Sequence, residues 1–162
     1  MITVEVYNHL PNPTAVGELL KQSFVYTPAG EMPSLISKDV AHHIEVEKVK
    51  YLINLIEEPK WYVIAQDNDK LVGFGIVSES NLQYFYDLTW VCVDPAYRNQ
   101  GLGKRITEKA VKFAHIRDRV IIVTTEIPKF YTDLGFTQLG SYRPGWYLMT
   151  SDILKDLSLI HI

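Results

Sequence analysis

Residues 91–114 constrain the fold most, because an apolar run, a glycine-containing turn and an amphipathic helix follow one another there without a gap. The run Val91-Cys92-Val93 is typical of a buried strand, and Pro95 ends it because proline cannot donate to a β ladder. Beyond the turn, apolar side chains recur at helical spacing and basic side chains occupy the other face. The apolar positions are Leu102, Ile106, Ala110, Phe113 and Ala114.

A glycine turn that leads directly into a helix favours the binding of an anion. The first N–H groups of a helix have no partner within it, and the helix dipole adds about half a positive charge there. Gly101 and Gly103 let a phosphate approach the backbone without meeting a Cβ, while Arg98 and Lys104 add full positive charges. Residues 98–104 therefore predict a phosphate or diphosphate site.

Two common phosphate-binding motifs do not fit this turn. The P-loop needs glycine at position 98 and serine or threonine at position 105, and both positions are arginine. The dinucleotide pattern GxGxxG fails at Ile106, and no mononucleotide βαβ unit precedes the turn. The ligand must therefore belong to another class of phosphate compound.

The turn instead resembles the signature of the GCN5-related N-acetyltransferase (GNAT) superfamily, which is R/Q-x-x-G-x-G/A behind a strand that ends V-x-P. Here VDP stands at positions 93–95 and RxxGxG at positions 98–103. A second block also resembles the family, FYxxxGF at positions 130–136, and it follows after one helix and one strand. Two blocks in this order make a far more specific signal than a lone GxG.

The whole chain predicts a single α/β domain over residues 1–162 with a mixed sheet. Strands are expected at residues 2–7, 61–65, 71–77, 83–93, 120–123, 136–139 and 146–150. Helices are expected after a cap at Thr14, at residues 40–57, after the glycine turn, and at residues 128–134, with a last helical turn in the tail. The order βααβββαβαββ matches the GNAT-like acyl-CoA N-acyltransferase fold, in which the parallel fourth and fifth strands splay apart at a bulge.

The resemblance implies a site for acetyl-coenzyme A between those two strands. Its pantetheine would pair with the backbone of residues 91–93, that is Val91, Cys92 and Val93, and an N–H near Val93 would stabilise the oxyanion. Its diphosphate would be held by Arg98, Asn99, Gln100, Gly101, Leu102, Gly103 and Lys104. The implied reaction is direct attack of a primary amine, on a small molecule or peptide, on the acetyl thioester, without a metal.

Two residues are the candidates for catalysis. Tyr131 matches the family tyrosine that acts as general acid near the sulfur. Its ordinary pKa of about 10 lies above the thiol's of about 8.5, so a hydrogen bond that strengthens as charge builds on sulfur describes its role. Many family members carry an asparagine after the fifth strand, where this chain has Thr124, Thr125 and Glu126. Glu126 is the preferred general base, and Asp87 on the fourth strand is the alternative.

Composition excludes some functions and leaves others open. A net charge of −3 argues against broad nucleic-acid binding, and no apolar run approaches membrane-spanning length. A single cysteine suits a reducing compartment, so a cytoplasmic protein is expected. Family members often form homodimers, although the sequence contains no recognisable dimer interface. Two alternatives share every motif above: a non-catalytic acyl-CoA-binding regulatory protein, and a transferase with a different acyl donor.

Overall fold

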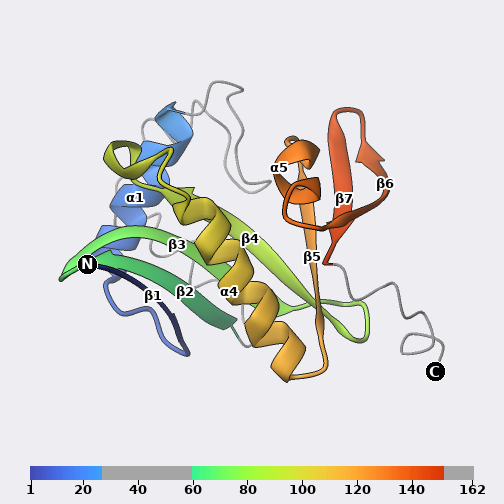
Figure 1. Ribbon diagram of the computed structural model, residues 1–162, viewed down its shortest axis with the longest axis horizontal. Helices are drawn as coiled ribbons and strands as arrows, with labels where there is room; N and C mark the ends of the chain where they lie inside the picture. Colours follow the sequence, from blue (N-terminus) through green and yellow to red (C-terminus); the bar gives the residue numbers. More distant parts are fainter. Residues whose placement is uncertain (27–59, 152–162) are drawn as a thin grey trace.

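The computed structural model describes residues 1–26 and 60–151. Within them, seven strands form one mixed sheet in the order β1-β2-β3-β4-β5-β7-β6 (Figure 1). The strands are β1 (Ile2–Tyr7), β2 (Lys60–Asp67), β3 (Lys70–Glu79), β4 (Phe85–Val93), β5 (Val120–Thr125), β6 (Thr137–Arg143) and β7 (Trp146–Thr150). The helices are α1 (Pro13–Tyr26), the 3₁₀ helix η1 (Pro95–Tyr97), α4 (Leu102–Ile116) and α5 (Pro128–Thr132). The helix expected at residues 40–57 and the helical turn in the tail lie outside the described residues.

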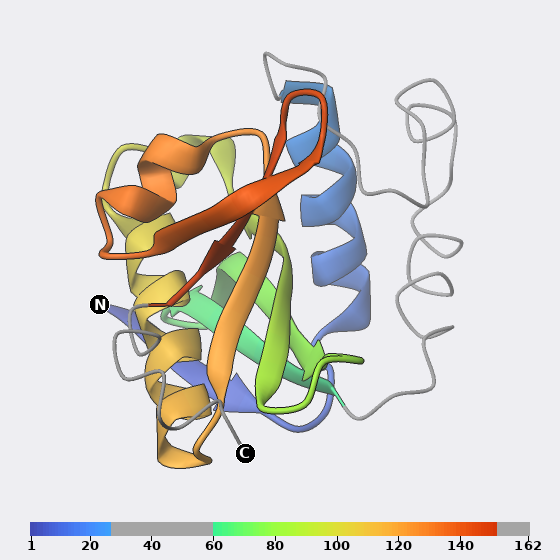
Figure 2. The same cartoon turned by 90° about the vertical axis from the view of Figure 1, so that its right-hand side faces the viewer.

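Helices cover both faces of the sheet, α4 and α5 on one side and α1 on the other (Figure 2). The α4 face is packed by Ile106, Ala110 and Ala114, each fully buried against β2, β3 and β5. The α1 face is packed by Val16 and Leu19 against residues of β2 and β3 and against Cys92 of β4. The periodicity of α4 therefore predicted its buried stripe correctly. None of the helices described here is both long and apolar enough to span a bilayer.

Two glycines of β3 let α4 lie close to the sheet. A Cβ added to Gly73 would stand 3.0 Å from Cδ1 of Ile106, and one added to Gly75 would stand 3.0 Å from Cγ2 of the same side chain. Both distances are shorter than ordinary van der Waals contact, so either substitution must displace Ile106 or the strand. This close packing fixes the height of α4, and with it the glycine turn, above the sheet.

Each of Gly73→Ala and Gly75→Ala is expected to lower the free energy of unfolding by about 1–3 kcal/mol, because overpacking strains a filled core. Ile106→Val removes Cδ1 and keeps Cγ2, so it should partly relieve Gly73→Ala and leave Gly75→Ala unrelieved. Urea unfolding of the two double-mutant cycles measures this difference. Equal coupling of Ile106→Val to both glycines would contradict the packing described.

A bulge in β4 makes β4 and β5 diverge. The strands pair in parallel only from Phe85 to Asp87, and beyond that point Figure 1 shows them separating. Ile76 of β3 pairs with Thr89 whereas Phe74 pairs with Cys92, so β4 carries one extra residue between the two pairs. Trp90 lies in this bulge with φ +54°, a conformation that a bulky side chain rarely adopts. The splayed strands that the family resemblance implied are therefore present.

Several boundaries differ from the sequence prediction, and two of them do so for identifiable local reasons. The cap of α1 is Asn12, whose side-chain oxygen accepts from the N–H of Ala15 at 3.2 Å, and Thr14 lies inside the helix. Strand β4 begins at Phe85 and not at residue 83, because Tyr84 adopts φ +72° and the N–H of Phe85 donates to the carbonyl of Leu82. A turn thus occupies the first two residues of the predicted strand.

Candidate active site

The bulge sets which groups β4 presents to the opening between β4 and β5. It reverses the alternation of side chains, so Val91 and Val93 join the α4 face while Trp90 and Cys92 face α1. The N–H of Asp94 donates to the carbonyl of Val72 at 2.8 Å. Because neighbouring residues of an antiparallel pair point their backbone groups in opposite directions, those of Val93 point away from β3. Among the described residues, the ladder between β4 and β5 ends at Asp87, so the free edge of β4 offers the backbone groups of Val93 toward β5.

The glycine turn connects this edge to α4. Asn99 and Gly101 adopt φ values of +63° and +77°, and Gly101 occupies the N-cap position of α4 without a side-chain cap. The first helical bond runs from the N–H of Arg105 to the carbonyl of Gly101 at 3.0 Å. The N–H groups of residues 102–104 therefore precede the helical ladder and point out of the helix end. Such an end stabilises a negative charge.

The basic residues around the turn divide into two groups. Arg105 donates to the carbonyl of Ile2 at 3.2 Å, and Lys109 lies 3.9 Å from Glu5, so both hold α4 against β1. Arg98 and Lys104 form no ion pair with any carboxylate in the part of the chain that the structure describes. Their charges remain available to an anion at the turn.

Gly103, Val93 and α5 converge beside the opening. A Cβ built on Gly103 would lie 3.5 Å from the ring of Phe130 and 4.0 Å from a methyl group of Val93. The ring of Tyr131 packs edge-on against Phe130 at 5.0 Å between centroids, and against Phe136 at 5.2 Å. Tyr131 is 8% exposed. The structure thus brings Tyr131, the glycine turn and the free edge of β4 into one region.

The two candidate bases occupy different places. Glu126 is half-buried in the bend between β5 and α5, where the N–H of Ile127 donates to Oγ1 of Thr125 at 2.9 Å. Asp87 lies at the last point where β4 pairs with β5. Its neighbours Tyr86 and Leu88 belong to the α4-side core, so Asp87 faces the α1 side of the sheet. Asp87 therefore does not share the face of Tyr131.

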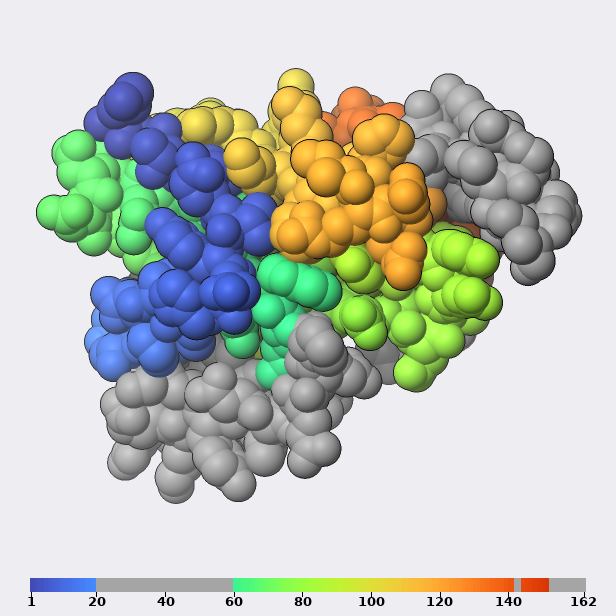
Figure 3. Space-filling model, turned by 90° about the horizontal axis from the view of Figure 1, so that it is seen from below, coloured from blue at the N-terminus to red at the C-terminus, as the bar shows by residue number. Residues whose placement is uncertain are grey.

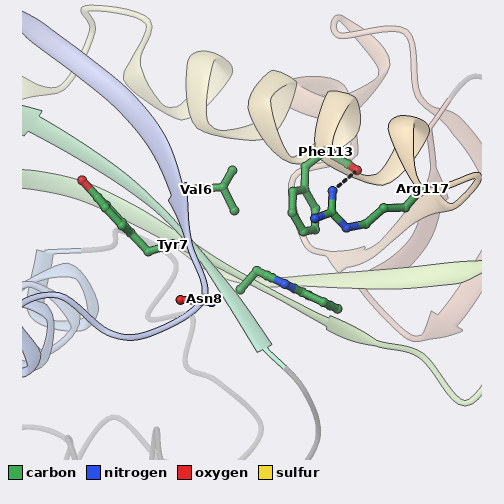
Figure 4. A pocket seen from close by; sticks show the side chains of 6 residues that line it. Val6, Tyr7, Asn8, Phe113 and Arg117 are labelled. Atoms are coloured by element: carbon green, nitrogen blue, oxygen red, sulfur yellow. Dashed lines mark hydrogen bonds between the residues drawn. The ribbon is translucent and has the colours of Figure 1, made fainter.

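One hollow lies away from this region. It measures about 530 Å³ and is lined by Val6, Tyr7, Asn8, Trp61, Phe113 and Arg117 (Figure 4). Figure 3 shows this face, where the start of β2 reaches the surface between the N-terminal residues and the end of α4. The guanidinium of Arg117 stacks 3.8 Å from the ring centroid of Phe113 and donates to its carbonyl at 3.4 Å, which caps the end of α4. The length of α4, about 20 Å, separates the hollow from the glycine turn.

No metal centre is evident in residues 1–26 and 60–151, where no group of three or more His, Cys, Asp or Glu side chains converges. The sequence interpretation also missed several polar residues next to the turn. The Asp94 carboxylate accepts from the N–H of Ala96 at 2.9 Å and so caps η1, and the Tyr97 hydroxyl donates to Asp67 at 2.8 Å. The Asp-Pro pair before a short helix was a usable signal for the cap. Nothing local signalled the bond from Tyr97.

Comparison with known families decides the classification. The family model described as an acetyltransferase (GNAT) domain matches residues 58–138, half of the chain and all of β3, β4, α4, β5 and α5. This chain belongs to the GNAT family. The matched residues include both the glycine turn at residues 98–104 and Tyr131.

Two curated proteins show where the similarity lies. The peptidyl-lysine N-acetyltransferase YjaB of Salmonella typhimurium is 30% identical over 87 residues, which cover 53% of this chain and 55% of that protein. An uncharacterised protein of Mycobacterium leprae is 34% identical over 91 residues, which cover 53% of this chain and 25% of that protein. This chain thus spans about half of the length of the Salmonella protein and about a quarter of the length of the Mycobacterium protein.

Solved structures extend the likeness to nearly the whole chain. The PaiA N-acetyltransferase of Thermoplasma acidophilum, determined in complex with coenzyme A, has a TM-score of 0.70 at 16% identity, covering 92% of this chain and 98% of that chain. Escherichia coli ElaA has a TM-score of 0.63 at 15% identity, covering 93% and 99%. Identities this low establish a shared GNAT fold alone.

Proposed function

We propose that this protein is an N-acetyltransferase that moves an acetyl group from acetyl-coenzyme A to a primary amine by direct attack. One observation carries the proposal: the uncapped end of α4 opens beside the free edge of β4, and Tyr131 packs against Phe130, whose ring lies next to Gly103. The GNAT family match supports an acyltransferase, and a neighbour of the same fold was determined with coenzyme A.

The residues present fit the diphosphate of coenzyme A. The turn supplies outward N–H groups from residues 102–104 and the side chains of Arg98 and Lys104. The conformation of Gly101, with φ +77°, is the physical reason for glycine there. Gly103 meets only ordinary contacts when a Cβ is added, so packing within the protein does not require glycine at that position. A ligand that approaches the backbone closely explains its presence better.

The free edge of β4 would hold the pantetheine arm. Val91 and Val93 alternate on that edge, and the amide groups of an extended pantetheine can pair with them as a further strand would. The same edge supplies the oxyanion donor, for which the N–H of Val93 is the assignment we propose. A backbone donor in this position stabilises the charge that develops on the thioester oxygen during attack.

The reaction needs a group that removes a proton from the amine and a group that stabilises the departing sulfur. The amine nitrogen bonds to the carbonyl carbon, the carbon–sulfur bond breaks, and the nitrogen loses a proton while the thiolate gains one. At pH 7 a lysine-like amine is neutral in under about 0.1% of molecules, which costs about 4–5 kcal/mol. Glu126 would accept the amine proton directly or through water, and the Tyr131 hydroxyl would donate to the departing sulfur.

Glu126→Gln is expected to lower kcat/KM for the amine about 10- to 100-fold with little change in coenzyme A affinity, because the side chain keeps its size and loses its basicity. Asp87→Asn serves as the matched control, since Asp87 faces the other side of the sheet. Initial rates as a function of pH measure both. A larger loss for Asp87→Asn would transfer the role of general base to that residue.

The acceptor class follows from the reaction and from one relative. Both small molecules and peptides present primary amines, and YjaB acts on peptidyl-lysine. Lysine side chains of peptides are therefore the first acceptors to test, followed by polyamines and amino sugars. The resemblance to the family implies that residues 24–39 and 140–146 would recognise the acceptor. The first segment lies almost entirely outside the described residues, and the second includes the turn between β6 and β7.

The deciding experiment incubates the protein with acetyl-coenzyme A and the amine panel and follows the release of free thiol, with mass spectrometry of the acceptor. Acetylated amine formed together with one equivalent of thiol supports the proposal. Tight binding of coenzyme A without turnover on any amine would instead indicate the non-catalytic acyl-CoA-binding protein. Turnover with another thioester but not the acetyl one would identify a different acyl donor.

A further inference from the structure

A group of polar side chains fastens the turn of one hairpin to the short helix that precedes the glycine turn. We define it as the clasp: Asp67 and Lys70 at the junction of β2 and β3, and Asp94 and Tyr97 at the two ends of η1. The Tyr97 hydroxyl donates to Oδ2 of Asp67 at 2.8 Å, and Lys70 Nζ lies 3.8 Å from Oδ2 of Asp94. Lys70 Nζ also lies 5.3 Å from the centre of the Tyr97 ring.

The clasp matters because η1 is held only in part by the core. None of the residues of η1 is buried, and the half-buried Tyr97 side chain packs against the α4-side core. By contrast, the chain just after the turn is held firmly, since Leu102 and Ile106 of α4 are 2% and 0% exposed. The turn at residues 98–101 therefore has its α4 end fixed by buried side chains, and its other end held by the packing of Tyr97 and by the polar contacts of the clasp. Tyr97→Phe keeps the ring and removes the hydrogen bond to Asp67.

We propose that Tyr97, held by Asp67, is a positioning residue for the diphosphate of coenzyme A, because it fixes the end of the turn from which Arg98 projects. This inference rests on the proposed function, since it assumes that the turn binds that diphosphate. Tyr97 itself does not enter the opening: its hydroxyl is engaged by Asp67 across 30 residues of sequence. Its effect reaches the ligand through the backbone of Arg98 and Asn99.

The ionisation of the clasp leaves it intact around neutral pH. The hydrogen bond from Tyr97 lowers the pKa of Asp67 below its ordinary value, and Asp67 raises the pKa of Tyr97 above its ordinary value. The other charged groups that face the pair are the amino group of Met1, 3.5 Å from Oδ1 of Asp67, and the side chains of Lys70 and Asp94. The contact is therefore lost only as pH falls through the pKa of Asp67 or rises through that of Tyr97. Measurements near pH 7 compare variants with the contact fully formed.

Tyr97→Phe and Asp67→Ala are expected to raise the Kd for coenzyme A and the KM for acetyl-coenzyme A about 5-fold each, the net contribution of one partly buried hydrogen bond. The KM for the amine and kcat at saturating donor should stay unchanged. Asp67→Asn keeps an acceptor for the Tyr97 hydroxyl and should recover most of the affinity. Tyr7→Phe, at the distant end of β1, is the matched control.

The decisive comparison uses S-acetylpantetheine, a donor that lacks the diphosphate. If the clasp positions the diphosphate-binding turn, Tyr97→Phe leaves kcat/KM for this donor at the wild-type value. Equal losses with both donors would overturn the inference and assign Tyr97 a general structural role. Unchanged binding of coenzyme A by Tyr97→Phe would also overturn it while the proposed function stands. Failure of the wild-type protein to bind coenzyme A would overturn both together.

Discussion

Gly101→Glu is expected to weaken coenzyme A binding by about 100-fold or more, and to remove the protection that coenzyme A gives against thermal unfolding. The carboxylate would stand at the end of α4, where the N–H groups of residues 102–104 point outward. At about 5 Å and an effective dielectric constant near 20, each pair of negative charges repels by about 3 kcal/mol. Calorimetric titration and melting curves with and without coenzyme A measure the loss.

The control must separate charge from backbone strain, because Gly101 has φ +77° and any side chain there is strained. Gly101→Gln has the same size and comparable backbone strain to Gly101→Glu and carries no charge. No heavy atom lies within 4 Å of a Cβ at this position, so the Cβ of neither variant clashes with the protein. Coenzyme A should bind Gly101→Gln within about 5-fold of wild type. Equal losses for the two variants would mean that shape, and not the phosphate charge, governs the site.

Regular elements of this fold follow from local patterns. The continuous apolar run Val120–Val123 predicted a central strand, and β5 indeed lies between β4 and β7 in the sheet. The apolar stripe of α4 and the alternation of β1 were correct for the same reason: periodicity reports which face is buried. The start of α4 after Gly101 could also be predicted, because two glycines and an Asp-Pro pair separate the strand from the helix there.

Features that depend on tertiary contacts could not be predicted from the sequence alone. The bulge came only from the family resemblance, since Trp90 carries no sequence signal for φ +54°. Trp90 packs on the α1 side of the sheet while the next residue, Val91, packs on the α4 side. The bond between Tyr97 and Asp67 joins residues 30 positions apart, and no periodicity connects them. The side of the sheet that Asp87 faces follows from the burial of Tyr86 and Leu88 on either side of it, which depends on tertiary packing.

The second prediction with a large expected effect concerns Tyr131. Its ring packs in the core, and its hydroxyl is the group proposed to act in the reaction. The ring is buried between those of Phe130 and Phe136, so Tyr131→Phe preserves the packing of α5. The hydroxyl is the part that would meet the sulfur of the leaving thiol. Its removal should lower kcat by about 100-fold, the lower end of the range for general acid catalysis, and leave the Kd for coenzyme A within about 2-fold.

Tyr86→Phe provides the matched control for this variant. Tyr86 is 6% exposed on the same face of the sheet and packs against Trp61 and Phe113, at the end of α4 remote from the glycine turn. Loss of its hydroxyl should leave kcat unchanged, so a fall in kcat limited to Tyr131→Phe identifies chemistry and not packing. If Tyr131→Phe instead loses coenzyme A affinity and kcat in proportion, the hydroxyl helps to hold the cofactor and the departing thiolate takes its proton from solvent. In that case the hydroxyl of Tyr131 is a binding group, and general acid catalysis by Tyr131 is excluded.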